Sequence, residues 1–199
     1  MADKAAPKRR RDPQRRIEEI AAATERVIAA RGIEGLTHRA VAEEAGVPLG
    51  ATTYHFATKD DLIEAALRRS VDRYAAYLDD WVAQRPGLTA EQLVVLLTDV
   101  LMGCFGPDRD ERTVELELFM AALRRPALRP IADRDIELTT NALLAYVDQD
   151  TAAAAAAAMT GLTLRGLAGS RPPTRTEVEA VLRRVLTPNP ALPPAPTRE

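Results

Sequence analysis

The sequence predicts an all-α protein of about nine helices, and two observations carry this prediction. Apolar residues recur every three to four positions along most of the 199 residues, which is the spacing of one helical face. Glycine or proline separates these periodic segments, and no alternating run is long enough for a convincing strand. We therefore expect a small N-terminal domain of three helices, over residues 15–60, and a larger helical domain over residues 61–187.

The small domain begins with a helix over residues 15–31, whose apolar face includes Ile17, Ile20 and Val27. This helix is expected to brace the two shorter helices that follow it. Thr37 can cap the first of these, because its hydroxyl can accept a hydrogen bond from a backbone N–H that the helix leaves unpaired.

A tight turn joins the two short helices. Gly46 stands where the first one must end, and glycine tolerates the left-handed backbone that such an end requires. Val47 fills the corner, Pro48 suits the first turn of the next helix, and Phe56 closes the pattern as an apolar anchor. This order of parts predicts a helix-turn-helix, whose second helix fits the major groove of DNA. The alternative is an ordinary helical hairpin, which shares the glycine turn.

Helical periodicity continues through the larger domain. Asp60 and Asp61 suit the N-terminal end of a long helix, and Thr89 can cap the next one. The expected helices cover residues 60–84, 89–104, 111–123, a stretch from a bend at residues 126–130 to about residue 147, 151–168 and 174–187.

Positive charge is concentrated at the N-terminus. Residues 1–16 hold seven basic and two acidic residues, whereas the whole chain has a net charge of -2. A basic, flexible arm over residues 1–14, densest at Arg9, Arg10 and Arg11, suits DNA phosphates or the minor groove. The alternative is a solvated tail. Residues 1–60 carry a net charge of +2 and residues 61–199 one of -4, so only the N-terminal part has the sign that binds DNA.

Four segments resemble the tetracycline-repressor (TetR) family of transcriptional regulators. They are ARGIEGLT over residues 30–37, AVAEEAGV over 40–47, YHF over 54–56 and TKDDL over 58–62. One departure is Thr52-Thr53, where the family usually has an apolar residue and then a tyrosine. We therefore expect looser packing at Thr52, and a phosphate contact that Tyr54 takes over in part.

The resemblance implies how the two short helices meet DNA. The first would touch phosphates, and Arg39 on it can reach a guanine edge. The second would face the groove floor, where Ala51 can meet a thymine methyl group. It has few long polar side chains, so shape and phosphate contacts should supply much of the affinity. His55 is either a contact or a half-buried packing residue. The expected DNA contacts are Thr37, His38, Arg39, Leu49, Gly50, Ala51, Thr53, Tyr54, His55 and Lys59, with Arg9, Arg10 and Arg11 of the arm.

The resemblance also implies a pocket for a small-molecule inducer in the larger domain. Bulky side chains there can line an apolar cavity, although each can equally belong to the core. An inward-facing Glu115 or Glu117 would favour a cationic ligand, because a buried carboxylate without a partner is costly. The expected pocket residues are Trp81, Met102, Phe105, Glu115, Phe119 and Tyr146.

The last two helices, over about residues 151–187, are expected to pair two copies of the chain, as the two C-terminal helices of the resembled family do. Seven consecutive alanines over residues 152–158 give the first of them a smooth face. The alternative is that both helices only complete the core of the monomer. A homodimer would present two heads to a palindromic operator. Residues 188–199 form a proline-rich tail that is expected to be disordered.

Composition argues against several other classes of protein. The chain has two histidines and one cysteine, and carboxylate pairs such as Glu115/Glu117 and Asp133/Asp135 sit two apart and point to different helix sides, so no enzyme, cofactor or metal site is expected. The charged N-terminus and the short alanine tract predict neither a signal peptide nor a membrane span, and hence a cytoplasmic protein. The prediction is a ligand-responsive repressor. A transcriptional activator of the same fold, and a helical ligand-binding or scaffold protein without DNA binding, are the alternatives.

Overall fold

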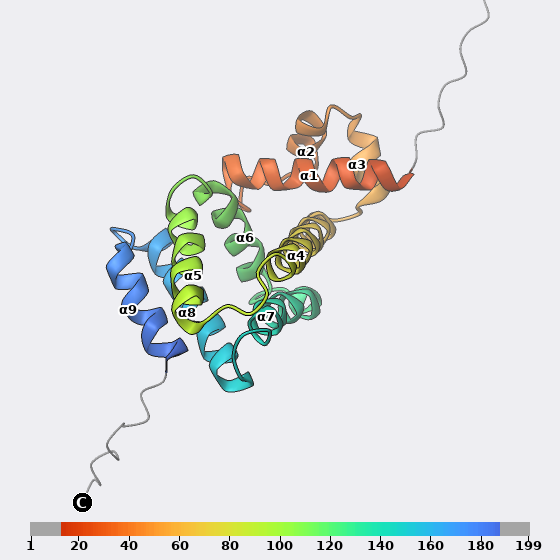
Figure 1. Ribbon diagram of the computed structural model, residues 1–199. Coiled ribbons are helices and arrows are strands. Elements are labelled where there is room, and N and C mark those ends of the chain that lie inside the picture. The colour runs from red at the N-terminus through yellow and green to blue at the C-terminus, as the bar shows by residue number, and fades with distance from the viewer. Residues whose placement is uncertain (1–12, 188–199) are drawn as a thin grey trace, which may run out of the picture. The chain divides into compact units, whose positions relative to one another are not determined.

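The computed structural model describes residues 13–187, and nine α-helices with one short 3-10 turn make up this part of the chain (Figure 1). No strand occurs between residues 13 and 187, so the all-α prediction is confirmed. The chain divides into two compact units at Ser70 and Val71. We call residues 13–70 the head and residues 71–187 the C-terminal unit. The predicted basic arm up to residue 12 and the tail over residues 188–199 lie outside the described residues.

Four helical segments build the head. They are α1 (Pro13–Arg31), α2 (His38–Ala45), α3 (Leu49–His55) and the first part of α4 (Lys59–Ala83). Helix α1 packs against α2, and α2 packs against α3 (Figure 1). The buried apolar residues of the head include Ile20, Val27, Ile28, Leu36, Val41, Leu62 and Ile63.

The head ends at Ser70 rather than at the predicted boundary of residue 60, because the first turns of α4 belong to it. Leu62 and Leu67 are at most 2% exposed. Arg69 of α4 also donates a hydrogen bond to the carboxylate of Glu25 on α1 at 2.7 Å. Helix α4 then continues into the C-terminal unit, so one helix belongs to both units.

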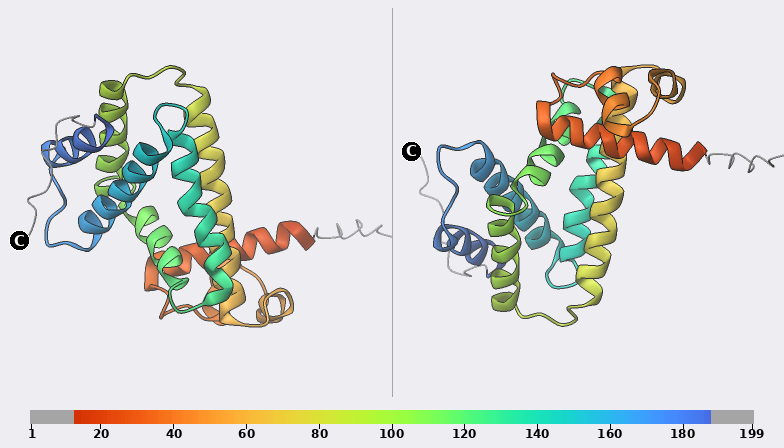
Figure 2. Two further views of the ribbon diagram at one scale, coloured as in Figure 1. Left: turned by 90° about the horizontal axis from the view of Figure 1, so that it is seen from below. Right: turned by 90° about the horizontal axis from the view of Figure 1, so that it is seen from above.

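The C-terminal unit contains the rest of α4 and five further helices. They are α5 (Ala90–Phe105), α6 (Arg109–Ala121), α7 (Arg129–Leu143), α8 (Gln149–Ala168) and α9 (Arg175–Leu186), with the 3-10 turn η1 (Pro126–Leu128) before α7. Helices α5, α8 and α9 pack together (Figure 2). Small side chains of α8 meet large ones here, which lets the helices approach closely. The buried residues of this core include Leu93, Leu97 and Leu101 of α5, Ala152, Ala155 and Ala156 of α8, and Val178, Leu182 and Leu186 of α9.

Helices α5 and α6 are joined by a sharp turn over residues 106–108. Arg109 at the start of α6 donates to the carbonyl oxygens of Gly166 and Leu167 at 3.4 and 2.9 Å, and so caps the end of α8. Between residues 13 and 187 no single helix has the length and apolar character to cross a membrane, and α5 with α6 meets that test only as a pair bent by 90°.

Most helix bounds lie within two residues of the predicted ones. Thr89 and Thr174 each form a capping box at the start of a helix, with Gln92 and Glu177 respectively. Helix α6 covers residues 109–121 rather than 111–123. Helix α7 stops at Leu143 rather than near residue 147, because the chain then tightens into a turn.

Candidate nucleic-acid interface and ligand cavity

The turn between α2 and α3 has the geometry that the sequence predicts. The side chain of Thr37 accepts a hydrogen bond from the backbone N–H of Ala40 at 3.1 Å. Gly46 ends α2 with φ at 63°, in the left-handed region, and its N–H donates back to carbonyl oxygens of α2. Val47 is 9% exposed and fills the corner. Helices α2 and α3 therefore form the predicted helix-turn-helix.

The inner face of α3 is held by Thr52 and Phe56. Thr52 is fully buried, and its hydroxyl donates to the carbonyl oxygen of Leu49 at 2.8 Å. Phe56 is 7% exposed at the end of the helix. The hydroxyl of Thr52 is thus satisfied within its own helix, and the methyl group packs where the resembled family places an apolar side chain.

Replacing Thr52 by valine is expected to raise the free energy of unfolding by up to about 1 kcal/mol. Valine keeps the shape of the side chain and removes a buried polar group. Thr52→Ala removes the packing methyl as well and is expected to lower the free energy of unfolding by about 1 kcal/mol. Urea unfolding followed by circular dichroism measures both. A valine variant that is less stable than the alanine variant would contradict this account of the buried threonine.

The outer face of α3 is exposed and carries no long polar side chain. Leu49 is 44% exposed and Tyr54 is 84% exposed, and Gly50 and Thr53 are exposed with them. The hydroxyl of Thr53 lies 3.4 Å from the carbonyl oxygens of Leu49 and Gly50. The ring of Tyr54 meets His55 edge-on, with 5.0 Å between the ring centroids. This face therefore offers mainly apolar groups and one phenol.

The other expected DNA contacts differ in exposure. Thr37 and Arg39 are exposed, whereas His38, Ala51, His55 and Lys59 are half-buried. The Nζ atom of Lys59 donates to the carbonyl oxygen of Glu34 at 3.4 Å, so this lysine is tied to the loop before α2. Arg9, Arg10 and Arg11 lie outside the described residues.

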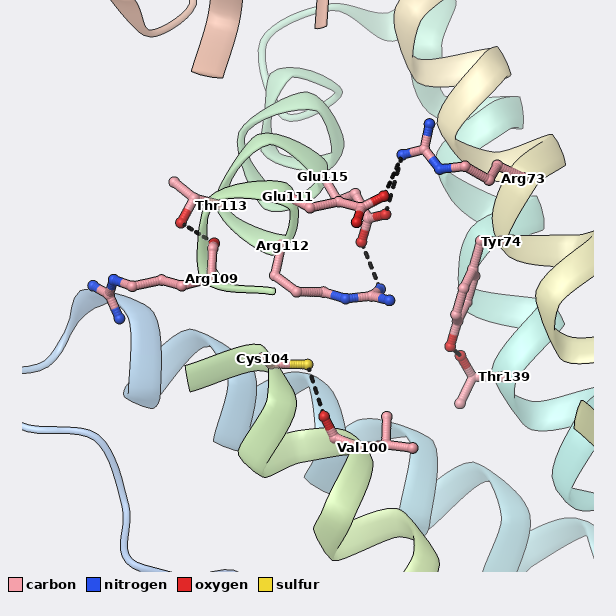
Figure 3. Close-up of polar contacts among 10 residues, drawn as sticks. All are labelled: Arg73, Tyr74, Val100, Cys104, Arg109, Glu111, Arg112, Thr113, Glu115 and Thr139. Atoms are coloured by element: carbon pink, nitrogen blue, oxygen red, sulfur yellow. Dashed lines mark hydrogen bonds and ion pairs between the residues drawn. The ribbon is translucent and has the colours of Figure 1, made fainter. Parts of the chain in front are cut away.

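A cavity of about 310 Å³ lies within the C-terminal unit, and α4, α5 and α6 line it. Its volume is at the lower end of the range for small-molecule sites. Figure 3 shows the polar contacts around it. Helix α4 supplies Arg73, Tyr74 and Tyr77; α5 supplies Asp99, Val100, Gly103 and Cys104; and α6 with the residue before it supplies Asp108, Glu111, Arg112 and Glu115.

Ion pairs join α4 to α6 at the cavity wall (Figure 3). Glu115 accepts hydrogen bonds from Arg112 at 2.5 Å and from Arg73 at 3.5 Å. Glu111 pairs with the same Arg73 at 3.2 Å. Burial raises the pKa of Glu115, although the positive charges of Arg112 and Arg73 act in the opposite direction. Four carboxylates and two guanidinium groups line the cavity, and Arg175 outside the lining pairs with Asp99 at 2.6 Å, so the carboxylates still outnumber the guanidinium groups. The two remaining carboxylates are those of Asp99 and Asp108.

The other polar groups of the wall are two phenols and a thiol. The hydroxyl of Tyr74 hydrogen-bonds the hydroxyl of Thr139 at 2.8 Å, and burial raises the pKa of Tyr74 to about 12. The ring of Tyr77 stacks on that of Tyr74 at 6.3 Å. The thiol of Cys104 donates to a backbone carbonyl, and burial raises its pKa too. These groups provide an aromatic surface and no activated nucleophile, which suits binding rather than catalysis.

Of the six side chains expected to line a pocket, Glu115 lines this cavity and the other five do not. Trp81 is 7% exposed and meets Tyr146 edge-on at 5.8 Å in the core. The remaining members are Met102 and Phe105, which pack against the same core, and Phe119, which is half-buried on α6.

Trp81 is buried in the core because large apolar side chains gain most from burial, and the other four side chains are half-buried. The cavity is lined instead by charges that ion pairs keep in place. The signal that could have marked it is the cluster of charges at Glu111, Arg112 and Glu115, beside the buried Val114 and Leu118 of the same helix.

Two family models match the chain. One, described as "Bacterial regulatory proteins, tetR family", matches residues 20–66, and the other, "Tetracyclin repressor-like, C-terminal domain", matches residues 88–188. The HTH-type transcriptional regulator PksA of Bacillus subtilis (strain 168) is 34% identical over 110 residues, a match that covers 55% of this chain and 51% of PksA. The chain therefore spans about half the length of this curated relative.

Solved structures match over more of the chain. The multidrug binding protein EbrR complexed with ethidium is 44% identical, with a TM-score of 0.74 over 85% of this chain and 98% of that chain. EbrR has also been solved with proflavin and with malachite green. A member of the TetR family from Streptomyces coelicolor A3, SCO1917, is 41% identical, with a TM-score of 0.68 over 85% of this chain and 97% of that chain.

Proposed function

Because this chain belongs to the tetR family of bacterial regulatory proteins, we propose that it is a repressor that binds a palindromic operator as a homodimer and leaves it when an inducer occupies the cavity. Regulators of this family control transcription through a DNA-binding helix-turn-helix, and they are not enzymes. Separate features of the molecule support operator binding, dimer formation and inducer binding.

The geometry of the head is the observation that supports operator binding. Helix α3 is held on its inner side by the buried Thr52 and Phe56, while its outer side is exposed. A firmly held helix with an exposed outer face is what insertion into the major groove requires. Arg39 on α2 and Tyr54 on α3 are exposed and can reach phosphates. Contacts to phosphates set the position of the head on the duplex.

An exposed stripe of small and apolar residues along α8 supports the pairing of two copies. We call it the α8 stripe, and it consists of Ala153, Ala157, Gly161, Leu164 and Ala168. Its members recur every three to four positions, so they share one face of the helix. The buried alanines of α8 already pack in the core with α5 and α9. A second copy that covers the stripe would give two heads for two half-sites.

The cavity supports a flat, positively charged inducer. Its wall has more carboxylates than guanidinium groups, and the stacked rings of Tyr74 and Tyr77 offer a surface on which an aromatic cation can pack. Ethidium, which is bound by the 44% identical EbrR, is a planar aromatic cation.

Helix α4 provides a link from the cavity to the head. It begins in the head at Lys59 and supplies Arg73 to the cavity wall. A cationic ligand competes with Arg73 for Glu111 and Glu115, and so weakens the ion pairs between α4 and α6. The ligand then binds more tightly to a state in which α4 is released from α6. Such unequal affinity for two states is what couples ligand binding to operator release. The altered position of α4 changes the spacing of the two heads and lowers operator affinity.

A release measurement tests this proposal. The operator is selected from random duplexes with the purified full chain, labelled, and followed by fluorescence anisotropy during ethidium titration. Because ethidium also intercalates into duplex DNA, the parent is compared with Glu115→Gln on the same duplex. We expect the parent to be released at lower dye concentration. Equal release of both proteins would contradict induction through the cavity, and the selection of no duplex would contradict operator binding.

A further inference from the structure

We infer that helix α3 recognises its operator by contact with thymine methyl groups, rather than by hydrogen bonds to base edges. The inference rests on the proposed operator binding and names the bases that the head selects. Its basis is the chemistry of the exposed face of α3, the hydroxyl of Thr53, and the unused space at Gly50.

The exposed face of α3 lacks the side chains that usually read bases by hydrogen bonding. Arginine and lysine bind guanine, and asparagine and glutamine bind adenine, but the helix reads LGATTYH and contains none of these four. Leu49 instead presents an apolar side chain that is 44% exposed. The C5 methyl of thymine is the apolar group that the major-groove edge of a base pair offers to such a side chain.

Thr53 adds a second apolar group to this face. Its hydroxyl is directed to the carbonyl oxygens of Leu49 and Gly50 at 3.4 Å, within its own helix. The hydroxyl proton is thus used within the helix, and the methyl group is available to a partner. A threonine methyl against a thymine methyl is a recognised base contact.

Gly50 indicates how closely α3 approaches the groove. A methyl group added at Gly50 would meet no atom within 4 Å, and the backbone there does not have the positive φ that favours glycine. The fold therefore has no need of glycine at this position, where alanine would form a more stable helix. Glycine is used where a backbone must come close to another surface. We assign Gly50 to the closest approach of α3 to the groove floor, flanked by the methyl groups of Leu49 and Ala51.

Uracil substitution tests the inference directly. Uracil lacks the C5 methyl of thymine and keeps its hydrogen-bonding groups. In the selected operator, each half-site thymine is replaced by uracil in turn, and thymines outside the half-sites are replaced as controls. We expect at least two half-site positions to respond. At each of them, loss of the methyl group should lower the affinity of the operator for the full chain about fourfold. An operator that binds equally well with uracil at every half-site thymine would overturn the inference while leaving operator binding intact.

Variants of α3 supply an independent test. Thr53→Val keeps the methyl group and removes the hydroxyl, whereas Thr53→Ser does the reverse. We expect the valine variant to bind the thymine operator more tightly than the serine variant, and the difference to shrink on the uracil operator. The opposite order would assign recognition to the hydroxyl. Gly50→Ala is expected to raise the melting temperature and to weaken operator binding at least about tenfold. Undiminished binding by that variant would contradict the close approach.

Discussion

Replacing Leu164 by arginine is expected to turn the proposed homodimer into a monomer and to lower operator affinity by at least about 100-fold. Leu164 belongs to the α8 stripe and is 43% exposed in the single chain. A two-fold interface contains every substitution twice, so the variant would bring two unpaired positive charges into an apolar contact. In a dimer, binding of one head holds the second head close to its half-site, at a high effective concentration. A monomer loses this advantage.

Sedimentation velocity measures the oligomeric state of this variant, and anisotropy with the selected operator measures its affinity. The matched control is Leu123→Arg, since Leu123 is another leucine, 67% exposed, just after α6. The control should remain a dimer and bind the operator. A dimeric Leu164→Arg protein, or a control that also dissociates, would contradict the assignment of the interface to the α8 stripe.

The head was the part of the molecule that the sequence predicted in most detail, because its signals are local. The cap at Thr37, the left-handed Gly46 and the buried corner at Val47 depend on neighbours within a few positions. Such signals can be recognised without knowing which distant segments pack together. The state of Thr52 was harder to foresee, because the sequence does not show that its hydroxyl is satisfied by its own helix.

The cavity could not be predicted in the same way. Arg73 and Glu115 are 42 positions apart and meet only because α4 and α6 pack at one wall. Helical periodicity states which face of each helix is apolar, but not which helices become neighbours. Of the bulky aromatic residues that suggested a pocket, Trp81 is buried in the core, and Phe105 and Tyr146 pack against that core rather than at the cavity. Glu115 was expected there together with Glu117, because an inward-facing carboxylate would favour a cationic ligand and would be costly without a partner.

Removing one carboxylate from the cavity wall, by Glu115→Gln, is expected to lower the affinity of the protein for ethidium by about 10- to 100-fold. In the parent, Glu115 holds Arg112 and Arg73 and can share its negative charge with a cationic ligand. Glutamine provides no charge and leaves the two guanidinium groups to repel the ligand. Ethidium fluorescence without DNA measures the affinity. Glu117→Gln is the matched control, since Glu117 is on the same helix and does not line the cavity.

The pH dependence of ethidium binding follows from the same carboxylate. Burial raises the pKa of Glu115, so this group becomes protonated at a higher pH than an ordinary glutamate. Because the cation binds the ionised form, its affinity should fall as the pH is lowered, and the fall should begin at a higher pH than an ordinary glutamate would give. Glu115→Gln should lose most of that fall, and Glu117→Gln should keep it. Equal pH profiles in all three proteins would remove Glu115 from ligand recognition, even if its replacement weakened binding.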